Sequence, residues 1–219
     1  MPQPDDIRYG VFLTPDAKTS AAVTSITGFV CAQFGLVSAK RFPPHVTLAG
    51  SLPIAVGEED LLEVVNGVAG RHVGFEIWNS GIGRLGDAAV VFDVHRDASG
   101  QPNAALIDLA ADVANAVQPL LRPVDSLAAD LPGRQSWRGH LSLASHELLD
   151  RVDLRDEVEA FIHQLDIAHP SYFPAQLVAV FRLHHHSWTG PWWTSFRWEH
   201  LRSFRLGKSV HSGQRSTSV

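Results

Sequence analysis

The sequence predicts a protein of the α+β class, and three observations support this prediction. Short runs rich in β-branched and aromatic residues lie between longer runs that have helical periodicity. Each half of the chain has a helix, then a strand that opens with histidine, then another helix, which hints at a duplication. The length of 219 residues suits one domain or two small lobes, and 45% hydrophobic against 19% charged residues excludes a disordered chain.

The first strand and the first helix are predicted from residue type and capping signals. Residues 7–13 (IRYGVFL) are rich in β-branched and aromatic side chains, which favour a strand. Pro15 in the sequence Thr-Pro-Asp suits the first turn of a helix. We expect that helix to run to about Phe34 and to end near Gly35.

Four further elements are predicted before the middle of the chain. A strand over residues 45–52 follows two prolines, and a helix begins at Gly57, where three acidic residues match its positive end. Residues 75–79 and 88–95 are predicted as two more strands. We expect a glycine-rich turn to join them, with Gly81, Gly83 and Gly86.

The second half repeats this alternation of helix and strand. Asn103 caps a helix with one apolar face, formed by Leu106, Leu109, Val113, Val117 and Leu120. Residues 122–138 are predicted as a loop and residues 139–144 as a strand. A fourth helix is marked by Leu154, Val158, Phe161, Ile162 and Leu165.

The chain is predicted to close with strands over residues 176–184 and 196–206. Residues 1–207 then form a single bilobal domain, and the polar residues 208–219 form a disordered tail.

Composition excludes several classes of protein. The formal charge of −5 hides a basic stretch at residues 182–219, so a broad basic footprint for long nucleic acid is missing while a small anion site fits. The one cysteine, Cys31, excludes an internal disulfide framework and a thiolate-only zinc site within one chain. Without a run of about 20 apolar residues or a signal-peptide pattern at the start, we expect a cytoplasmic protein with no membrane segment. We also expect a monomer.

Two segments repeat one pattern of histidine, apolar, hydroxyl, apolar. They are His-Val-Thr-Leu from His45 and His-Leu-Ser-Leu from His140. Alternate side chains of a strand share a face, so His45 lies beside Thr47, and His140 beside Ser142, above a buried apolar face. Two such strands side by side make a site with two imidazoles and two hydroxyls.

These four groups suit phosphodiester chemistry. Histidine can activate the attacking oxygen as a base or protonate the leaving oxygen as an acid near neutral pH. The hydroxyls can donate hydrogen bonds to the nonbridging phosphate oxygens. This chemistry requires neither a metal nor another cofactor.

The segments PHVTLAG and GHLSLAS resemble the paired motifs of the two-histidine phosphoesterase superfamily, which includes RNA 2′,3′-cyclic phosphodiesterases and 2′-5′ RNA ligases. The resemblance extends from the first strand to about Leu206. It implies two pseudo-symmetric lobes, each an antiparallel sheet with flanking helices, around a central groove. It also implies that His45 and His140 are catalytic and that Thr47 and Ser142 bind phosphate. We take His140 as the base and His45 as the acid, roles that exchange if the attacking and leaving oxygens do.

Other side chains near the motifs are candidates for binding the substrate. Arg138 shares the face of His140 if the strand extends that far, and its guanidinium could pair with phosphate or lie solvated in a loop. Phe42 and Trp137 could stack on a base or pack in the core. Trp188 opens a tryptophan-rich segment that could stack a nucleobase or clasp the last strand.

Three less specific signals complete the candidates. Arg41 and Arg134 are weaker candidates for phosphate contacts. The triplet His184-His185-His186 resembles a zinc site, but adjacent residues of a strand point to opposite faces, so we expect no metal there. His185 or Ser187 could still lie near the groove.

The leading prediction is therefore a metal-independent enzyme that hydrolyses a 2′,3′-cyclic phosphate, at an RNA 3′ end or on a cyclic nucleotide, to a monoester. One alternative is an oligonucleotide phosphodiesterase that cuts 2′-5′ or 3′-5′ linkages, which a wide basic channel would favour. The other is a non-catalytic protein that binds RNA ends or nucleotides. Binding alone would not need two titrating groups, so the two histidines favour the enzymes.

Overall fold

The computed structural model describes residues 7–124, 127–132 and 137–207 of the chain. Helices and antiparallel strands alternate along it, as the sequence predicts for an α+β fold. In chain order the elements are β1 (Ile7–Thr14), α1 (Ala17–Phe34), β2 (Val46–Leu52), α2 (Glu58–Arg71), β3 (Phe75–Trp78), β4 (Ile82–Leu85), β5 (Ala89–Asp93), α3 (Ala104–Val117), β6 (His140–Ala144), α4 (Arg155–Gln164), β7 (Tyr172–Ala175), β8 (Leu177–His184) and β9 (Arg197–Arg205). Short 3-10 turns occur at η2 (Gln118–Leu120), η3 (His146–Leu149), η4 (Val152–Leu154) and η5 (Trp192–Thr194).

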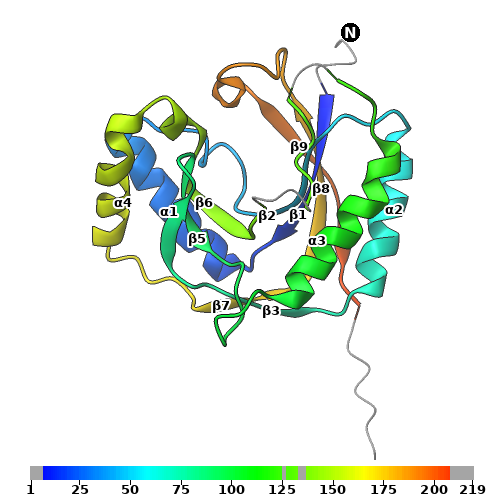
Figure 1. The fold of residues 1–219 in the computed structure, drawn as a ribbon, viewed down its shortest axis with the longest axis horizontal. Helices are drawn as coiled ribbons and strands as arrows, with labels where there is room; N and C mark the ends of the chain where they lie inside the picture. Colours follow the sequence, from blue (N-terminus) through cyan, green and yellow to red (C-terminus); the bar gives the residue numbers. More distant parts are fainter. Residues whose placement is uncertain (1–6, 125–126, 133–136, 208–219) are drawn as a thin grey trace, which may run out of the picture.

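Two sheets carry the two histidine motifs. One sheet has the strand order β2-β1-β8-β9 and the other the order β4-β5-β6, while β3 and β7 form a separate pair. Helices α2 and α3 lie on one side of the molecule and α1 and α4 on the other (Figure 1). Helix α3, from the second half of the chain, packs on β2 of the first half, and helix α1, from the first half, packs on β6 of the second. Each of these helices therefore covers the motif strand of the opposite half.

The unit β1–α1–β2 and the unit β5–α3–β6 are arranged alike. Both motif strands pair antiparallel with the strand that precedes their helix, and the register is the same. Thr47 lies opposite Phe12 in one pair, and Ser142 lies opposite Val91 in the other. This equivalence supports the duplication that the order of elements indicates, and it places the two motifs in matching positions.

Capping residues set the ends of α1 and the start of α3, and Pro15 lies before the cap of α1 rather than in its first turn as predicted. The carboxylate of Asp16 accepts a hydrogen bond of 2.9 Å from the Thr19 amide at the start of α1. The helix ends at Gly35, whose φ of 72° is the left-handed conformation that glycine adopts without strain. Asn103 likewise accepts a hydrogen bond of 3.2 Å from the Leu106 amide at the start of α3.

The region of β3 to β5 differs from the prediction. The glycine-rich turn contains the short strand β4, which pairs with β5, while β3 pairs with β7 instead. Gly81 and Gly86 have positive φ and form turns on either side of β4, so the glycines mark its ends. Strand β7 is absent from the prediction because Pro174 disfavours a strand unless it lies at an edge.

The β1 strand separates two apolar clusters. Val11 and Leu13 belong to the main core, together with buried side chains of α2, α3 and β6. Phe12 points to the opposite face and packs in a second group, called here the aromatic cluster: Phe12, Ala179, Phe181, Leu183, Trp188 and Phe196, with Phe42, Leu127 and Trp192 against it. The first motif is therefore supported from two faces of one sheet.

Two further predictions concern a membrane segment and the C-terminal tail. No helix in the described residues is long and apolar enough to cross a membrane. The predicted tail, residues 208–219, lies outside the described part of the chain.

Candidate active site

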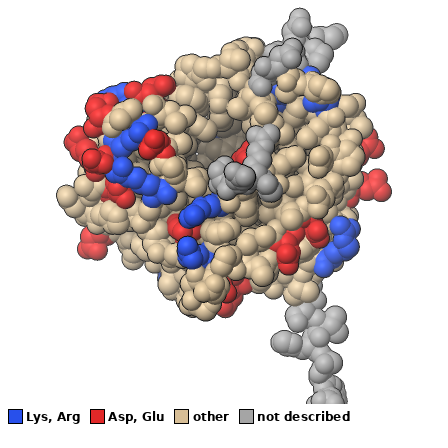
Figure 2. Space-filling model, in the orientation of Figure 1, with Lys and Arg blue, Asp and Glu red and all other residues tan. Residues whose placement is uncertain are grey.

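The two motif histidines stand at the starts of neighbouring strands. His45 immediately precedes β2 and His140 is the first residue of β6. The residues that follow them, Val46 and Leu141, are fully buried, which fixes the opposite face of each strand in the core. Strands β2 and β6 contact each other near the centre of the molecule (Figure 1). The surface is hollowed between the two helical sides (Figure 2).

The hydroxyl partners share this half-exposed face. Thr47 and Ser142 are both partly buried, as are His45 and His140, in contrast to the fully buried residues between them. The alternation predicted for the two motifs is therefore present in both. Each strand offers one imidazole and one hydroxyl to the same side.

Both imidazoles make the same local hydrogen bond. The Nδ1 of His45 lies 2.7 Å from the carbonyl oxygen of Pro43, and the Nδ1 of His140 lies 2.7 Å from that of Arg138. A carbonyl oxygen only accepts, so Nδ1 carries the proton and donates it in each ring. In the neutral rings this leaves the Nε2 lone pair for a substrate. The second residue before each histidine therefore fixes which nitrogen reacts.

Burial and mutual repulsion shift the titration of these rings. Burial, and to a lesser degree the charge of His140, lower the pKa of His45 to about 4. Burial also lowers the pKa of His140, while the carboxylates of Asp130 and Asp93 act in the opposite direction. The influence of one ring on the other places the two imidazoles within electrostatic reach of each other.

Aromatic rings enclose the His45 side of the site. The ring centroid of His45 lies 4.3 Å from that of Phe12 and 4.7 Å from that of Phe42, both in edge-on contacts. Phe42 also contacts Phe181 at 5.0 Å and Trp198 at 5.7 Å. These contacts hold the first imidazole against a rigid wall, and they make Phe42 part of that wall.

The surroundings of His140 are polar. Asp93 is its partner in the pairing of β5 with β6. His146, six residues further along, stacks on Trp193 with a centroid distance of 5.2 Å. Burial is the main reason that the pKa of His146 lies below the usual value, and the charge of His140 contributes. Sequence reasoning missed His146 because its place depends on Trp193, far along the chain.

The two candidate tryptophans differ in their surroundings. Trp188 is only 4% exposed in the aromatic cluster, with the guanidinium carbon of Arg8 5.9 Å from its ring centroid. The prediction that Trp188 stacks on a nucleobase is therefore wrong, because packing occupies the ring. Trp137 is half-buried, and its indole nitrogen donates a hydrogen bond of 3.3 Å to the Thr47 carbonyl. It ties the segment before His140 to the first motif strand.

The remaining candidates fall in three places. Arg138 is exposed two residues before His140, but β6 begins at His140, so the strand does not extend to Arg138. Arg41 is exposed too, and its carbonyl accepts a hydrogen bond of 2.9 Å from the Trp198 indole. Arg134 lies outside the described residues.

The triple histidine lies at the end of β8 and its rings have separate partners. His185 Nε2 is 2.9 Å from the Ser195 hydroxyl, while His184 Nε2 is 4.0 Å from the Glu199 carboxylate. The three residues line a cleft of about 540 Å³ with Ser195, Arg197, Trp198 and Glu199. Within the described ranges, no group of three or more histidine, cysteine or acidic side chains is placed to hold a metal ion.

A carboxylate just after the second motif holds the segment that leads to the first. Oε1 of Glu147 accepts hydrogen bonds of 2.7 Å and 2.8 Å from the amides of Val37 and Ser38. The Ser38 hydroxyl donates to the other oxygen of the same carboxylate. Because Glu147 follows β6 and Ser38 precedes His45, this contact links the two motifs across the site.

Comparison with known proteins gives a family model and several similar structures. The model described as the 2′-5′ RNA ligase superfamily matches residues 15–185. Among curated protein sequences, none is similar enough to count as a relative. Crystal structures of E. coli LigT with NADP⁺ and with ATP are 14% and 13% identical, with TM-scores of 0.51 and 0.53. The alignments cover 92% of this chain and 98% of each LigT chain, so LigT shares the fold.

Proposed function

The chain belongs to the 2′-5′ RNA ligase superfamily, whose members are two-histidine phosphoesterases, and on this premise we propose a specific reaction for it. The protein hydrolyses a 2′,3′-cyclic phosphate, at an RNA 3′ end or on a nucleotide, to a monoester. His45 and His140 carry out acid–base catalysis, and Thr47 and Ser142 bind the nonbridging oxygens. No metal takes part in these steps.

One observation carries this proposal: the matched hydrogen bonds of the two imidazoles. Each Nδ1 is held by a main-chain carbonyl at 2.7 Å, so each Nε2 is left for proton transfer. A protein that only binds nucleotides has no need for two imidazoles in the same fixed orientation. A hydrolase needs one base and one acid, and two such rings supply both.

The surroundings of the rings favour a division of roles that reverses the assignment made from sequence. His45, with its pKa near 4, is neutral at pH 7 and suits the base. Burial lowers the pKa of His140 as well, but the Arg138 carbonyl and the nearby carboxylates of Asp130 and Asp93 oppose this shift and favour its protonated form. His140 therefore suits the acid that protonates the leaving oxygen.

The reaction then proceeds with a balanced transfer of protons. A water oxygen attacks phosphorus while Nε2 of His45 takes one of its protons. The bond from phosphorus to one ribose oxygen breaks, and protonated His140 gives its Nε2 proton to that oxygen. The hydroxyls of Thr47 and Ser142 donate to the nonbridging oxygens as their charge changes. General acid–base help of this kind contributes about 10²–10⁴-fold.

Two of the side chains predicted to bind substrate remain part of the proposal. Phe42, partly exposed beside His45, offers an aromatic surface to the nucleoside. Arg138, exposed beside His140, offers a guanidinium to a phosphate group of the substrate, which is identified below.

The test is hydrolysis of a nucleoside 2′,3′-cyclic phosphate by the purified full chain in the presence of a chelator. We expect turnover by the wild type and almost none by His45→Ala or His140→Ala. His163→Ala is the matched control, because that histidine is exposed at the end of α4. Thermal melting checks that each variant is folded.

Each other outcome contradicts the proposal in a distinct way. Loss of activity on adding chelator contradicts a metal-free mechanism. Cleavage of 2′-5′ or 3′-5′ linked oligomers without opening of cyclic phosphates identifies an oligonucleotide phosphodiesterase. Binding of these compounds without turnover identifies a nucleotide-binding protein.

A further inference from the structure

The two halves of the site are alike at the reacting groups and different at their flanks. The carbonyls that hold the two imidazoles belong to Pro43 and Arg138, which occupy equivalent positions before the two histidines. The side chain at this position is therefore an uncharged ring in the first motif and a cation in the second. Because only the second motif has a cation at this position, an anionic substrate can bind across the two motifs in one orientation only.

The guanidinium of Arg138 is available to a ligand. Its side chain makes no hydrogen bond or ion pair with any residue that the structure describes. Two other arginines, by contrast, have carboxylate partners: Arg84 binds Asp156 and Glu159, and Arg182 binds Glu58 and Glu199. An exposed guanidinium beside a reacting histidine is thus left free in a protein whose net charge is −5.

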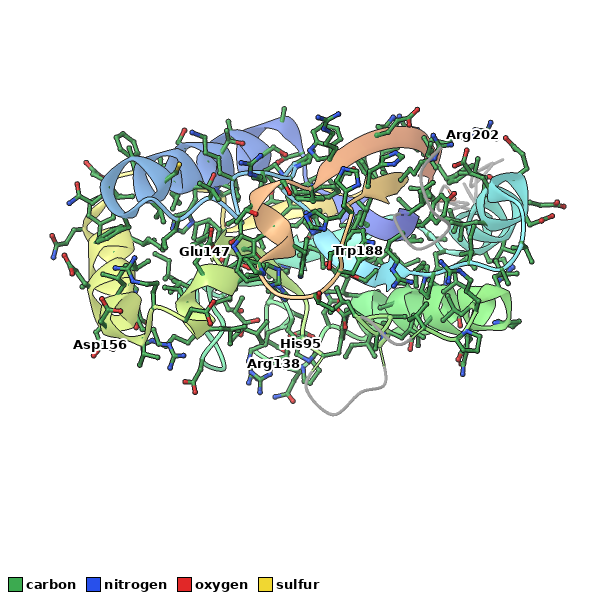
Figure 3. The ribbon with its side chains drawn as sticks, turned by 90° about the horizontal axis from the view of Figure 1, so that it is seen from above. His95, Arg138, Glu147, Asp156, Trp188 and Arg202 are labelled. Carbon is green, nitrogen blue, oxygen red and sulfur yellow. The ribbon has the colours of Figure 1, made fainter. Side chains whose placement is uncertain are left out.

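A second donor lies next to it. Nδ1 of His95 accepts a hydrogen bond of 3.4 Å from the Gly139 amide, so Nε2 carries the proton in the neutral ring. The His95 ring also lies edge-on to Trp137, with centroids 5.9 Å apart, which restrains its orientation. His95 and Arg138 lie side by side at one edge of the molecule (Figure 3).

Positive charge gathers at this place. Burial lowers the pKa of His95, and the charges of Arg138 and Arg96 lower it further, while Asp93 raises it. Arg96 is exposed, and its NH1 donates to the Gly100 carbonyl at 2.7 Å. The Asp93 carboxylate accepts from the His95 main-chain amide at 2.9 Å. Both guanidinium groups are thus close enough to His95 to influence its titration, and a bound anion would interact favourably with them.

We propose that the Arg138 guanidinium and the Nε2–H of His95 form a second anion subsite, which binds a further phosphate group carried by the substrate. This inference rests on the proposed function, since it places the subsite beside the phosphate that reacts at His140. Arg138 lies two residues before His140, in the segment that leads into β6, so its guanidinium is near enough to bind a phosphate next to the one that reacts. A planar guanidinium can bind such a group with two parallel hydrogen bonds.

The consequence is a preference among substrates that share the same reacting group. A nucleoside 2′,3′-cyclic phosphate has no further phosphate. The same compound with a 5′-phosphate has a terminal one, and a dinucleotide with a 2′,3′-cyclic end has one between its nucleosides. The simple cyclic phosphate measures the reaction without the second contact. The other two compounds show whether a terminal phosphate or one between two nucleosides makes that contact.

The experiment compares KM and kcat for these three compounds in wild type, Arg138→Gln, His95→Gln and Arg202→Gln. We expect at least one of the two compounds with a further phosphate to have a KM about tenfold below that of the simple cyclic phosphate. Arg138→Gln and His95→Gln should bring this ratio close to one. Arg138→Gln leaves the main-chain carbonyl that holds His140 in place. Arg202, an exposed cation at a far corner of the molecule, is the matched control and should keep the ratio (Figure 3).

The dependence on salt gives a second measurement. Loss of one phosphate contact should reduce the slope of log KM against log salt concentration by about 0.7 for the preferred compound. Equal KM values for all three compounds in the wild type, or a ratio that Arg138→Gln and His95→Gln both leave unchanged, would overturn the subsite. Absence of turnover with every cyclic phosphate would instead overturn the proposed function.

Discussion

Substituting Gly10 by alanine tests whether the aromatic wall sets the position of His45. Gly10 lies in β1 two residues before Phe12, whose ring folds back over the glycine. A Cβ at residue 10 would lie 2.1 Å from Cζ and 2.2 Å from Cε2 of Phe12. Carbon atoms in contact are about 3.5–4.0 Å apart, so the ring would have to move by more than about 1 Å.

That movement has two measurable consequences. Phe12 is buried in the aromatic cluster, and forcing extra volume into a packed cluster costs about 1–3 kcal/mol of stability. Its ring centroid is 4.3 Å from that of His45, so a displaced ring moves the imidazole or leaves it unsupported. Misplacing a reacting group by about 1 Å can lower the rate about 10²-fold. We expect Gly10→Ala to lose both stability and most of its kcat.

The control is a second glycine with open space around it. Gly28 lies in α1 with no atom within 4 Å of a built Cβ, so Gly28→Ala should gain about 0.5–1 kcal/mol and keep full activity. Denaturant unfolding and hydrolysis of a cyclic phosphate measure the two effects.

A double variant tests the cause directly. Phe12→Leu removes the ring that the new Cβ meets, so adding Gly10→Ala to it should cost much less than adding it to the wild type. If Gly10→Ala folds with wild-type stability and activity, the ring does not lie over residue 10 and the reasoning about the wall fails.

Two further predictions concern titration and the contact between the motifs. The profile of kcat/KM against pH should be bell-shaped. As pH increases, the rate should rise around pH 4, where His45 loses its proton, and fall again with a midpoint below pH 6.5, where His140 loses the proton that it donates. A rate still rising at pH 7 would contradict this division of roles. Glu147→Gln should lower stability by about 1–3 kcal/mol in denaturant unfolding and reduce kcat, because the amides of Val37 and Ser38 lose a charged acceptor. Unchanged stability and kcat in that variant would show that the contact does not hold the first motif in place.

Much of the fold follows from signals that involve only neighbouring residues. Asp16 and Asn103 mark helix starts because their side chains accept from amides three residues ahead. Gly35 marks a helix end because of its backbone conformation. Strand β7 and the pairing of β3 were not predictable in this way, because they depend on segments about 100 residues apart.

The candidate site likewise has features that depend on neighbouring residues and features that depend on distant segments. The alternation of histidine and hydroxyl in both motifs is a local property of a strand, and the structure shows it in each. The aromatic wall beside His45, the contact of Glu147 with Ser38 and the approach of His95 to Arg138 all join distant segments. The burial of Trp188 is a result of the same kind, since the sequence alone favoured packing only slightly over stacking.

The sequence alone determined that this protein is an α+β chain with two strands that each present an imidazole and a hydroxyl. Only the tertiary structure decided which rings enclose His45, which charges surround His140 and that Arg138 makes no ion pair with the described residues. The physical reason is that alternation and capping act over a few residues, whereas burial, electrostatic coupling and ring contacts depend on how far-apart segments pack together.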